Sequence, residues 1–107
     1  MTVGEADTAR ALGTGTVDVL GTPRIVALCE EAARYGGMYI SHLRSEGAGL
    51  LPAVDELIAI ARRARLPAEI YHLKQAGRDN WGKLDSVIAR VEAARAAGLR
   101  ITADMYT

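Results

Sequence analysis

The chain has 107 residues, of which half are hydrophobic, and its 13 basic and 13 acidic side chains cancel to a net charge of zero. This length allows at most one small domain, and the neutral balance excludes an electrostatic case for nucleic acid or an anionic membrane as a partner. Because no apolar run approaches the roughly 20 residues of a membrane span, the first residues lack a signal-peptide apolar region, and a single cysteine allows no internal disulfide, we expect a soluble, cytoplasmic α/β protein.

The first predicted elements are a short strand near Val17–Leu20 and a helix from Pro23 to about Arg34. Proline is favoured at the first position of a helix, and threonine is favoured as the residue that caps it. Thr22 is therefore predicted as the N-cap of this helix. Cys29 falls on the apolar side of the helix, so it is expected to be a small buried hydrophobe.

The rest of the chain alternates between β-prone and helical segments. Strands are predicted near Met38–His42, Ala68–His72 and Arg100–Tyr106. Between them, apolar residues recur at three- to four-residue spacing, which predicts helices over Gly49–Arg65 and Lys83–Ala97. Strand–helix–strand connections of this length favour parallel strands with right-handed crossovers. The pattern therefore predicts a parallel β-α-β-α-β sheet whose carboxyl ends, where α/β folds keep their chemistry, carry both histidines.

The two histidines of the chain share a pattern, because each ends a predicted strand and is followed two residues later by a cation. The pairs are His42 with Arg44 and His72 with Lys74. Alternate side chains of a strand point to one face, so each histidine is expected to point the same way as its cation. Two imidazoles and two cations would then surround one spot, as in a metal site beside an anion-binding group. The alternative is two structural histidines and two solvated cations, since two imidazoles are fewer ligands than zinc normally uses.

Residues 32–107 carry the segments SHLRSEG, YHLK, GRDNWGK and ADMYT in order. This stretch resembles the D-aminoacylase (N-acyl-D-amino-acid deacylase) branch of the amidohydrolases. The resemblance implies a metal-dependent (β/α)8 barrel that cleaves the amide bond of small-molecule N-acyl-D-amino acids. About three consecutive strands of such a barrel are represented, so the expected fold is a partial barrel preceded by the N-terminal strand and helix.

The same resemblance implies roles for individual residues. His42 and His72 match the histidines that bind the metal, which is expected to be zinc. Lys74 matches the basic residue that holds the substrate carboxylate, and Tyr106 matches the tyrosine of a DxY strand beside the substrate. Arg44 matches the arginine of the SHxR motif and is a further substrate-binding candidate with no assigned role.

Three parts of that family's site have no counterpart in the sequence. The HxH pair of the first strand, the cysteine-type ligand of an early strand and the aspartate base of the last strand are all missing. Cys29 does not lie in the cysteine motif, and Asp104 belongs to a different motif from the base. The site is therefore expected to be incomplete, and this chain alone is expected to be inactive.

Residues 1–34 resemble a second family, the fluoroacetyl-CoA thioesterase-like group of hotdog-fold proteins. In that group a V-x-V-L-x-T-P strand leads into the central helix. Thr22 and Glu30 match its catalytic threonine and glutamate, whereas its histidine lies on a later strand that this chain does not reach. Their ordinary roles would be helix capping and helix-surface charge. The resemblances divide the chain into a thioesterase-like segment, 1–34, and a barrel fragment, 35–107, as in a truncated, frameshifted or recombinant product.

Three functions follow from these observations. The first is the metal-dependent amidohydrolase activity described above, and the second is an acyl-CoA thioesterase. The third is a fragment without catalytic activity that associates with copies of itself, because a three-stranded piece of a barrel leaves two unpaired edges and an uncovered apolar face. One geometric test separates the metal reading from a chance pattern: the imidazoles of His42 and His72 should lie at the same sheet end, on the order of 3–7 Å apart.

Overall fold

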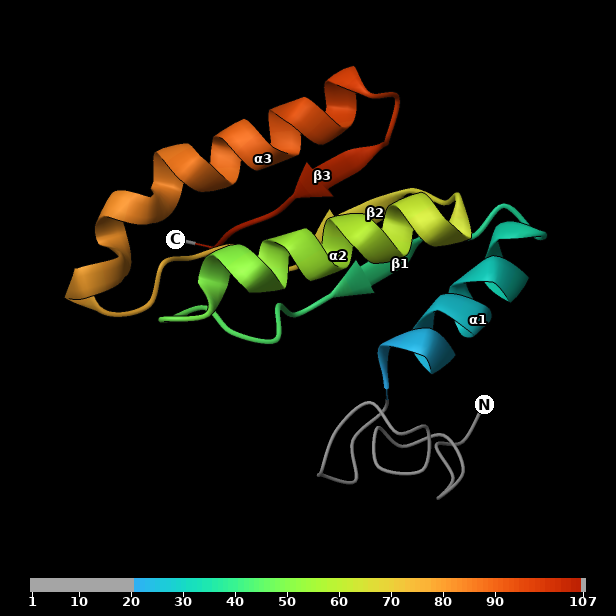
Figure 1. Ribbon diagram of the computed structural model, residues 1–107, viewed down its shortest axis with the longest axis horizontal. Coiled ribbons are helices and arrows are strands. Elements are labelled where there is room, and N and C mark those ends of the chain that lie inside the picture. Colours follow the sequence, from blue (N-terminus) through green and yellow to red (C-terminus); the bar gives the residue numbers. More distant parts are fainter. Residues whose placement is uncertain (1–20, 107) are drawn as a thin grey trace.

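The computed structural model describes residues 21–106, so the strand predicted near Val17–Leu20 lies outside the described residues. The elements in chain order are α1 (Thr22–Ala33), β1 (Tyr39–Ser41), α2 (Leu50–Ala64), β2 (Ala68–Ile70), a 3-10 helix η2 (Arg78–Lys83), α3 (Leu84–Ala96) and β3 (Ile101–Ala103). The three strands form one parallel sheet in the order β1-β2-β3 (Figure 1). The predicted α/β arrangement with a parallel β-α-β-α-β segment is confirmed. No helix within the described residues has the length and apolar character needed to cross a membrane.

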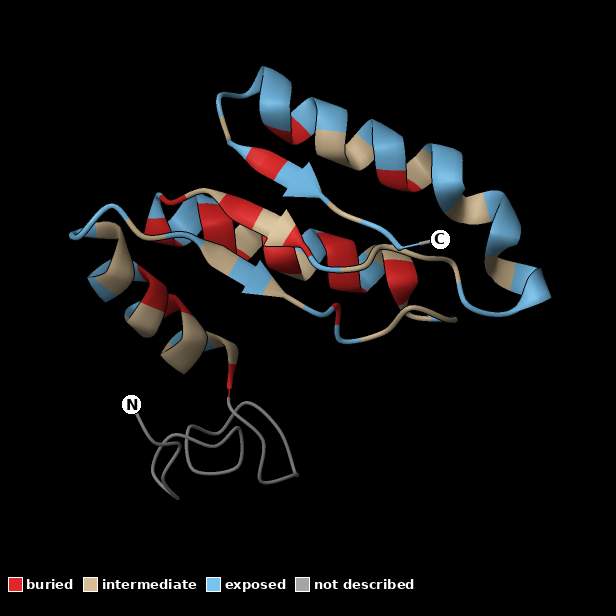
Figure 2. Ribbon diagram, turned by 180° about the vertical axis from the view of Figure 1, so that it is seen from behind, coloured by how far each residue is buried: buried red, intermediate tan, exposed pale blue. Residues whose placement is uncertain are grey.

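Within the described residues, helices cover only one face of the sheet (Figure 2). The strand register pairs Ala68 with Ile101, and both side chains point toward the helices together with Ile70. All three are at most 1% exposed. They pack with a buried set from α2 and α3, which includes Leu50, Val54, Leu57, Ala61, Val87 and Ala94. Burying a side chain of this kind contributes about 1.5–3 kcal/mol relative to leaving it in water, so this cluster holds the strands in register.

The apolar spacing of α2 matches its buried residues well, whereas the apolar spacing of α3 matches its buried residues only in part. Eight of the fifteen residues of α2 are buried, and the helix ends at Arg65, whose φ of 55° is left-handed. In α3 only Val87 and Ala94 are buried. Leu84 and Ile88 belong to the same apolar pattern but are 40% and 43% exposed, because nothing in residues 21–106 packs on that side of α3. The segment 77–82, which reads as a loop, instead forms most of η2 and runs directly into α3.

Helix α1 packs against α2 through a second buried cluster. Val26 and Cys29 from α1 meet Ile60, Ala64 and Leu66 there. Cys29 is 6% exposed, and burial raises the pKa of its thiol, as expected for a small hydrophobe rather than a reactive group. The helix that resembles part of a thioesterase therefore packs into the same structural unit as the three-stranded sheet.

The prediction that Thr22 caps α1 is wrong. Gly21 occupies the N-cap position with extended backbone angles, and no side chain caps the helix. The Gly21 carbonyl accepts hydrogen bonds from the backbone N–H groups of Arg24 and Ile25 at 3.0 and 3.1 Å. Thr22 is already helical, and Pro23 still lies in the first turn, where its missing N–H costs nothing. The helix begins one residue earlier than predicted because Gly21 readily adopts the extended conformation of an N-cap.

Replacing Thr22 with alanine is expected to change the free energy of unfolding by less than about 0.5 kcal/mol, the usual range for a surface position without a special role. A capping threonine would instead cost about 1 kcal/mol. Urea denaturation of both proteins measures the difference. Leu50→Ala serves as the positive control, since a fully buried leucine loses about 2–5 kcal/mol. A loss near 1 kcal/mol for Thr22→Ala would mean that the hydroxyl does cap the helix in solution.

No helix among residues 21–106 covers the second face of the sheet (Figure 2). Ile40, Glu69 and Thr102 are paired across the strands and point away from the helices. In Figure 2, which views the chain from behind, the strands lie in front of α2 and no helix crosses them. Met38, Ile40 and Tyr71 are about half exposed, at 48%, 51% and 49%. The uncovered face predicted for a partial barrel is therefore present within the described residues, but it is mixed rather than apolar, since Glu69 and Thr102 lie beside Ile40. Within the same residues β1 and β3 have no outer neighbours.

Candidate metal centre

The two histidines meet at the carboxyl end of the sheet. Strand β1 ends at Ser41, directly before His42, and β2 ends at Ile70, two residues before His72. Nδ1 of His42 lies 3.0 Å from Nε2 of His72, and the ring centroids are 4.6 Å apart. The predicted separation and placement are confirmed. Adjacent parallel strands carry both side chains to one edge, which is why sequence spacing alone located them.

The backbone at His72 departs from strand geometry. Its φ of 39° lies in the left-handed region, which is uncommon for a residue other than glycine. The backbone N–H of His72 donates a hydrogen bond of 2.7 Å to Oδ1 of Asp104, which follows β3. A separate side-chain hydrogen bond between Asp104 and Glu69 raises the pKa of the Glu69 carboxyl. Asp104 thus fixes the turn that presents the His72 ring, a positioning role that its sequence motif did not indicate.

Glu46 is a third member of the site, and sequence reasoning missed it. Its Oε2 lies 3.2 Å from Nδ1 of His72, and its Oε1 lies 3.8 Å from Nε2 of His42. One ligand atom from each of the three residues can be chosen so that all lie within 4.8 Å of one another. The available signal was a carboxylate four residues after His42 in the SHLRSEG segment.

Hydrogen bonds within and between two loops position Glu46. The Ser45 hydroxyl oxygen accepts from the backbone N–H groups of Gly47 and Gly49, at 3.3 and 3.2 Å, and so closes a turn around Glu46. The Glu46 carbonyl accepts a 2.8 Å bond from the N–H of Ala76, in the loop that follows His72. The Glu46 side chain is left only 12% exposed. The carboxylate is therefore held over His72 before any ligand arrives.

Lys74 completes the cluster from the same loop as His72. Its Nζ donates to Oε2 of Glu46 at 2.9 Å, and it lies 2.9 Å from Nδ1 of His72. Burial opposes ionisation of Glu46, but the hydrogen bond and charge of Lys74, with a contribution from His42, outweigh it and lower the pKa of Glu46. The hydrogen bond to Glu46 in turn raises the pKa of Lys74. Both groups are therefore charged at neutral pH.

The second expected cation does not join the site. The Arg44 Nε donates to both carboxylate oxygens of Glu56, on α2, at 3.1 and 3.0 Å. Two imidazoles and one cation meet, rather than two of each, because strand alternation does not extend into these loops. Tyr106 does lie close by, with its ring centroid 5.2 Å from Lys74 Nζ and 6.2 Å from the His72 ring. The substrate-binding roles of Arg44, Lys74 and Tyr106 stay predictions.

The thioesterase-like pair lies elsewhere. Thr22 and Glu30 both belong to α1, which packs against α2. Neither is among the hydrogen-bonding partners given above for the histidine cluster. Glu30 is exposed, as expected for an ordinary acid on a helix surface.

The donor set fits a divalent transition metal. Zinc binds imidazole nitrogen and carboxylate oxygen at about 2.0–2.2 Å, so tetrahedral ligand atoms stand roughly 3.3 Å apart. With one ligand atom from each of His42, His72 and Glu46, the three atoms lie within 4.8 Å of one another, so small side-chain movements would bring them to that spacing. Two histidines and one glutamate are also a known zinc set for catalytic sites, which leave a further position open. Glu46 therefore joins the two predicted histidines as a third possible ligand.

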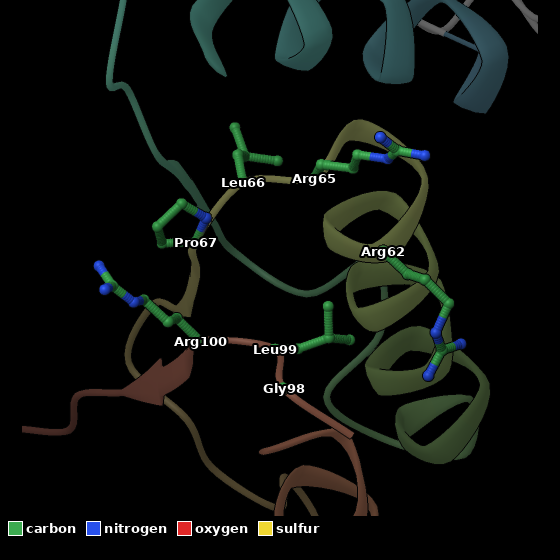
Figure 3. Close-up of a pocket in the computed structure, with 7 residues that line it drawn as sticks. All are labelled: Arg62, Arg65, Leu66, Pro67, Gly98, Leu99 and Arg100. Atoms are coloured by element: carbon green, nitrogen blue, oxygen red, sulfur yellow. The ribbon is translucent and has the colours of Figure 1, made fainter. Parts of the chain in front are cut away.

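A hollow of about 380 Å³ lies at the opposite end of the sheet. Its lining comes from the segments that precede β2 and β3: Arg62, Arg65, Leu66, Pro67, Gly98, Leu99 and Arg100. Figure 3 shows the guanidinium groups of Arg62 and Arg100 pointing to opposite sides, with Leu99 between them. The cations do not converge on one point, so this hollow lacks the arrangement of an anion site, and the chemistry gathers at the histidine end.

Comparisons with known proteins point to one group of enzymes, although none of the protein-family models matches the chain. The N-acyl-D-glutamate deacylase of Alcaligenes xylosoxydans xylosoxydans is 38% identical over 79 residues, which cover 74% of this chain and 16% of that enzyme. Two solved structures are similar over 90% of this chain. One is the N-acyl-D-glutamate deacylase from Bordetella bronchiseptica, complexed with zinc and a phosphonate inhibitor (28% identity, TM-score 0.80, 20% of that chain). The other is a D-aminoacylase described as defining a novel subset of amidohydrolases (29%, 0.76, 22%).

These relatives are D-aminoacylases and N-acyl-D-amino-acid deacylases, the same group of amidohydrolases that the SHLRSEG and YHLK segments resemble. The chain spans about one sixth of the curated relatives it matches. The structural match covers 90% of the chain, so it reaches beyond residues 32–107 into the thioesterase-like stretch. None of these relatives is a thioesterase, and the hotdog resemblance gains no support.

Proposed function

We propose that the chain is a segment of an N-acyl-D-amino-acid deacylase, a metal-dependent amidohydrolase, and that it carries part of that enzyme's metal site. The observation that carries this proposal is the meeting of His42, His72 and Glu46 at the carboxyl end of two parallel strands. The relatives support this proposal, because their names specify N-acyl-D-glutamate and N-acyl-D-aspartate as substrates and one of the solved structures contains zinc. Zinc is accordingly the metal we propose, and the cytoplasm is the compartment.

Each residue of the cluster has a task in this proposal. A bound zinc ion would polarise the scissile carbonyl and activate a water molecule. His42 and His72 would supply imidazole nitrogen, and Glu46 would supply a carboxylate whose pKa is already lowered. Lys74 offers an ammonium group for the substrate carboxylate, and the Tyr106 ring lies beside it. Asp104 holds the backbone of His72.

Isothermal titration of the purified chain with zinc at neutral pH tests the metal site. One zinc ion per chain is expected to bind, and His42→Ala or His72→Ala should each remove saturable binding, because two remaining ligands are too few for a stable site. Circular dichroism of each variant checks that the fold persists. An absence of saturable binding in the unmutated chain and in every variant would overturn the proposal.

A second candidate is a role without catalysis, in which copies of the chain associate. Among residues 21–106 the sheet face with Met38, Ile40 and Tyr71 and the outer edges of β1 and β3 are uncovered, which favours this role. Exposed parallel edges offer unpaired backbone groups to another chain.

A further inference from the structure

The ammonium group of Lys74 lies among the atoms that a metal would need. Its Nζ is 2.9 Å from Glu46 Oε2, 2.9 Å from His72 Nδ1 and 3.1 Å from the His72 carbonyl oxygen. An ammonium group has three donors and no acceptor. All three neighbours therefore act as acceptors toward it, and the lysine is held as a small cation would be.

These contacts assign the protons on the imidazoles. Since Lys74 can only donate, Nδ1 of His72 carries a lone pair, and in the neutral ring Nε2 then carries the proton. Nε2 of His72 accordingly donates to Nδ1 of His42 at 3.0 Å. The 3.2 Å approach of Glu46 Oε2 to Nδ1 of His72 brings two acceptors together. The shared ammonium of Lys74 bridges them and removes the repulsion.

We propose that Lys74 is an internal competitor for the metal site, whose ammonium must leave Glu46 and His72 before a divalent cation can bind. Each neutral imidazole offers one lone pair, and the lone pair of His72 is engaged by Lys74. A metal at Nδ1 would take the place of the ammonium. A metal at Nε2 would force the ring proton to Nδ1, where it would face the ammonium. Lys74 has to move in either case.

This inference rests on the proposed metal site and adds Lys74 as a residue that sets the affinity of that site for a divalent cation. The displaced ammonium is then free to meet an anionic group, so occupation of the site and availability of the cation are linked. A cation only a few ångströms from the ligands also repels a divalent ion directly, by Coulomb's law at the reduced dielectric of a half-buried site.

The chain suits a controlled test because it contains two lysines, Lys74 and Lys83. Lys83 Nζ bonds to Ala48 O and Asn80 Oδ1, away from the histidines. Zinc titration of Lys74→Met is expected to show at least about tenfold tighter binding than the unmutated chain, since a repelling charge has been removed. Lys74→Arg should stay near the original affinity, and Lys83→Met should change it by less than about twofold, because its charge lies outside the site.

A second readout uses the unmutated chain. An amine-acylating reagent followed by mass spectrometry should modify Lys74 faster once zinc is present, with Lys83 unchanged. Equal zinc affinity in the unmutated chain and Lys74→Met, with unchanged acylation, would overturn the inference and leave the metal site standing. Binding by Lys74→Met alone would support it strongly. Binding by neither protein would overturn both proposals. If Lys74→Met does not fold, the zinc affinity of Lys74→Gln and the acylation rate of Lys74 in the unmutated chain test the inference instead.

Discussion

Purified chain supplied with zinc is expected to hydrolyse N-acyl-D-amino acids no faster than buffer does. The sequence contains only two histidines, so the HxH pair that the family resemblance implies has no residues to form it. The aspartate base implied by the same resemblance is also missing. General base catalysis alone contributes about 10²–10⁴-fold in rate, and losing metal ligands as well should leave nothing measurable. Release of free amino acid over a day, followed by amine derivatisation and chromatography, measures this.

The control for that experiment is the double variant His42→Ala with His72→Ala. Equal background from both proteins is the expected result. Turnover by the unmutated chain that the double variant lacks would contradict the reading of an incomplete site. It would mean that several copies together supply the missing groups, and the rate would then rise more steeply than in proportion to protein concentration.

Replacing Glu46 with glutamine is expected to weaken zinc binding by at least about 10–100-fold, the loss typical of even indirect partners of a metal ligand. The amide keeps the shape of the side chain but loses its charge and much of its strength as a ligand. Glu56→Gln is the matched control, because it makes the same change at a carboxylate that pairs with Arg44. Zinc competition against a coloured chelator measures all the affinities.

Equal affinity in the two glutamine variants would show that Glu46 is not a ligand. Because Glu46 also anchors Lys74, the double variant Glu46→Gln with Lys74→Met separates the two effects. A ligand role predicts that Glu46→Gln still weakens binding when residue 74 is methionine. A role limited to holding the lysine predicts that the loss disappears in that background.

The elements were predictable where one physical rule dominated. The apolar spacing of α2 fixed that helix to within one residue at each end, because eight of its side chains are buried on one side. The meeting of His42 and His72 followed from the shared direction of parallel strands. Both results depend on features that repeat along the chain, and such features are visible in sequence.

What the sequence did not reveal depends on single turns. Glu46 reaches the histidines because Ser45 closes a local turn, and nothing periodic marks that turn. Arg44 points away from the histidines because it pairs with Glu56 on α2, which lies twelve residues later in the chain. Gly21 rather than Thr22 is the N-cap of α1, since both residue types are acceptable there and the backbone path decides between them.

The short chain distance between the three proposed metal ligands has a consequence for synthesis on the ribosome. His42 and His72 are thirty residues apart and Glu46 lies between them, within two strands joined by one crossover helix. Domains fold from the amino end as they are made, and contacts close in sequence form fastest. In a longer chain that contains this segment, we expect His42, Glu46 and His72 to come together on the nascent chain before any later strands have been translated.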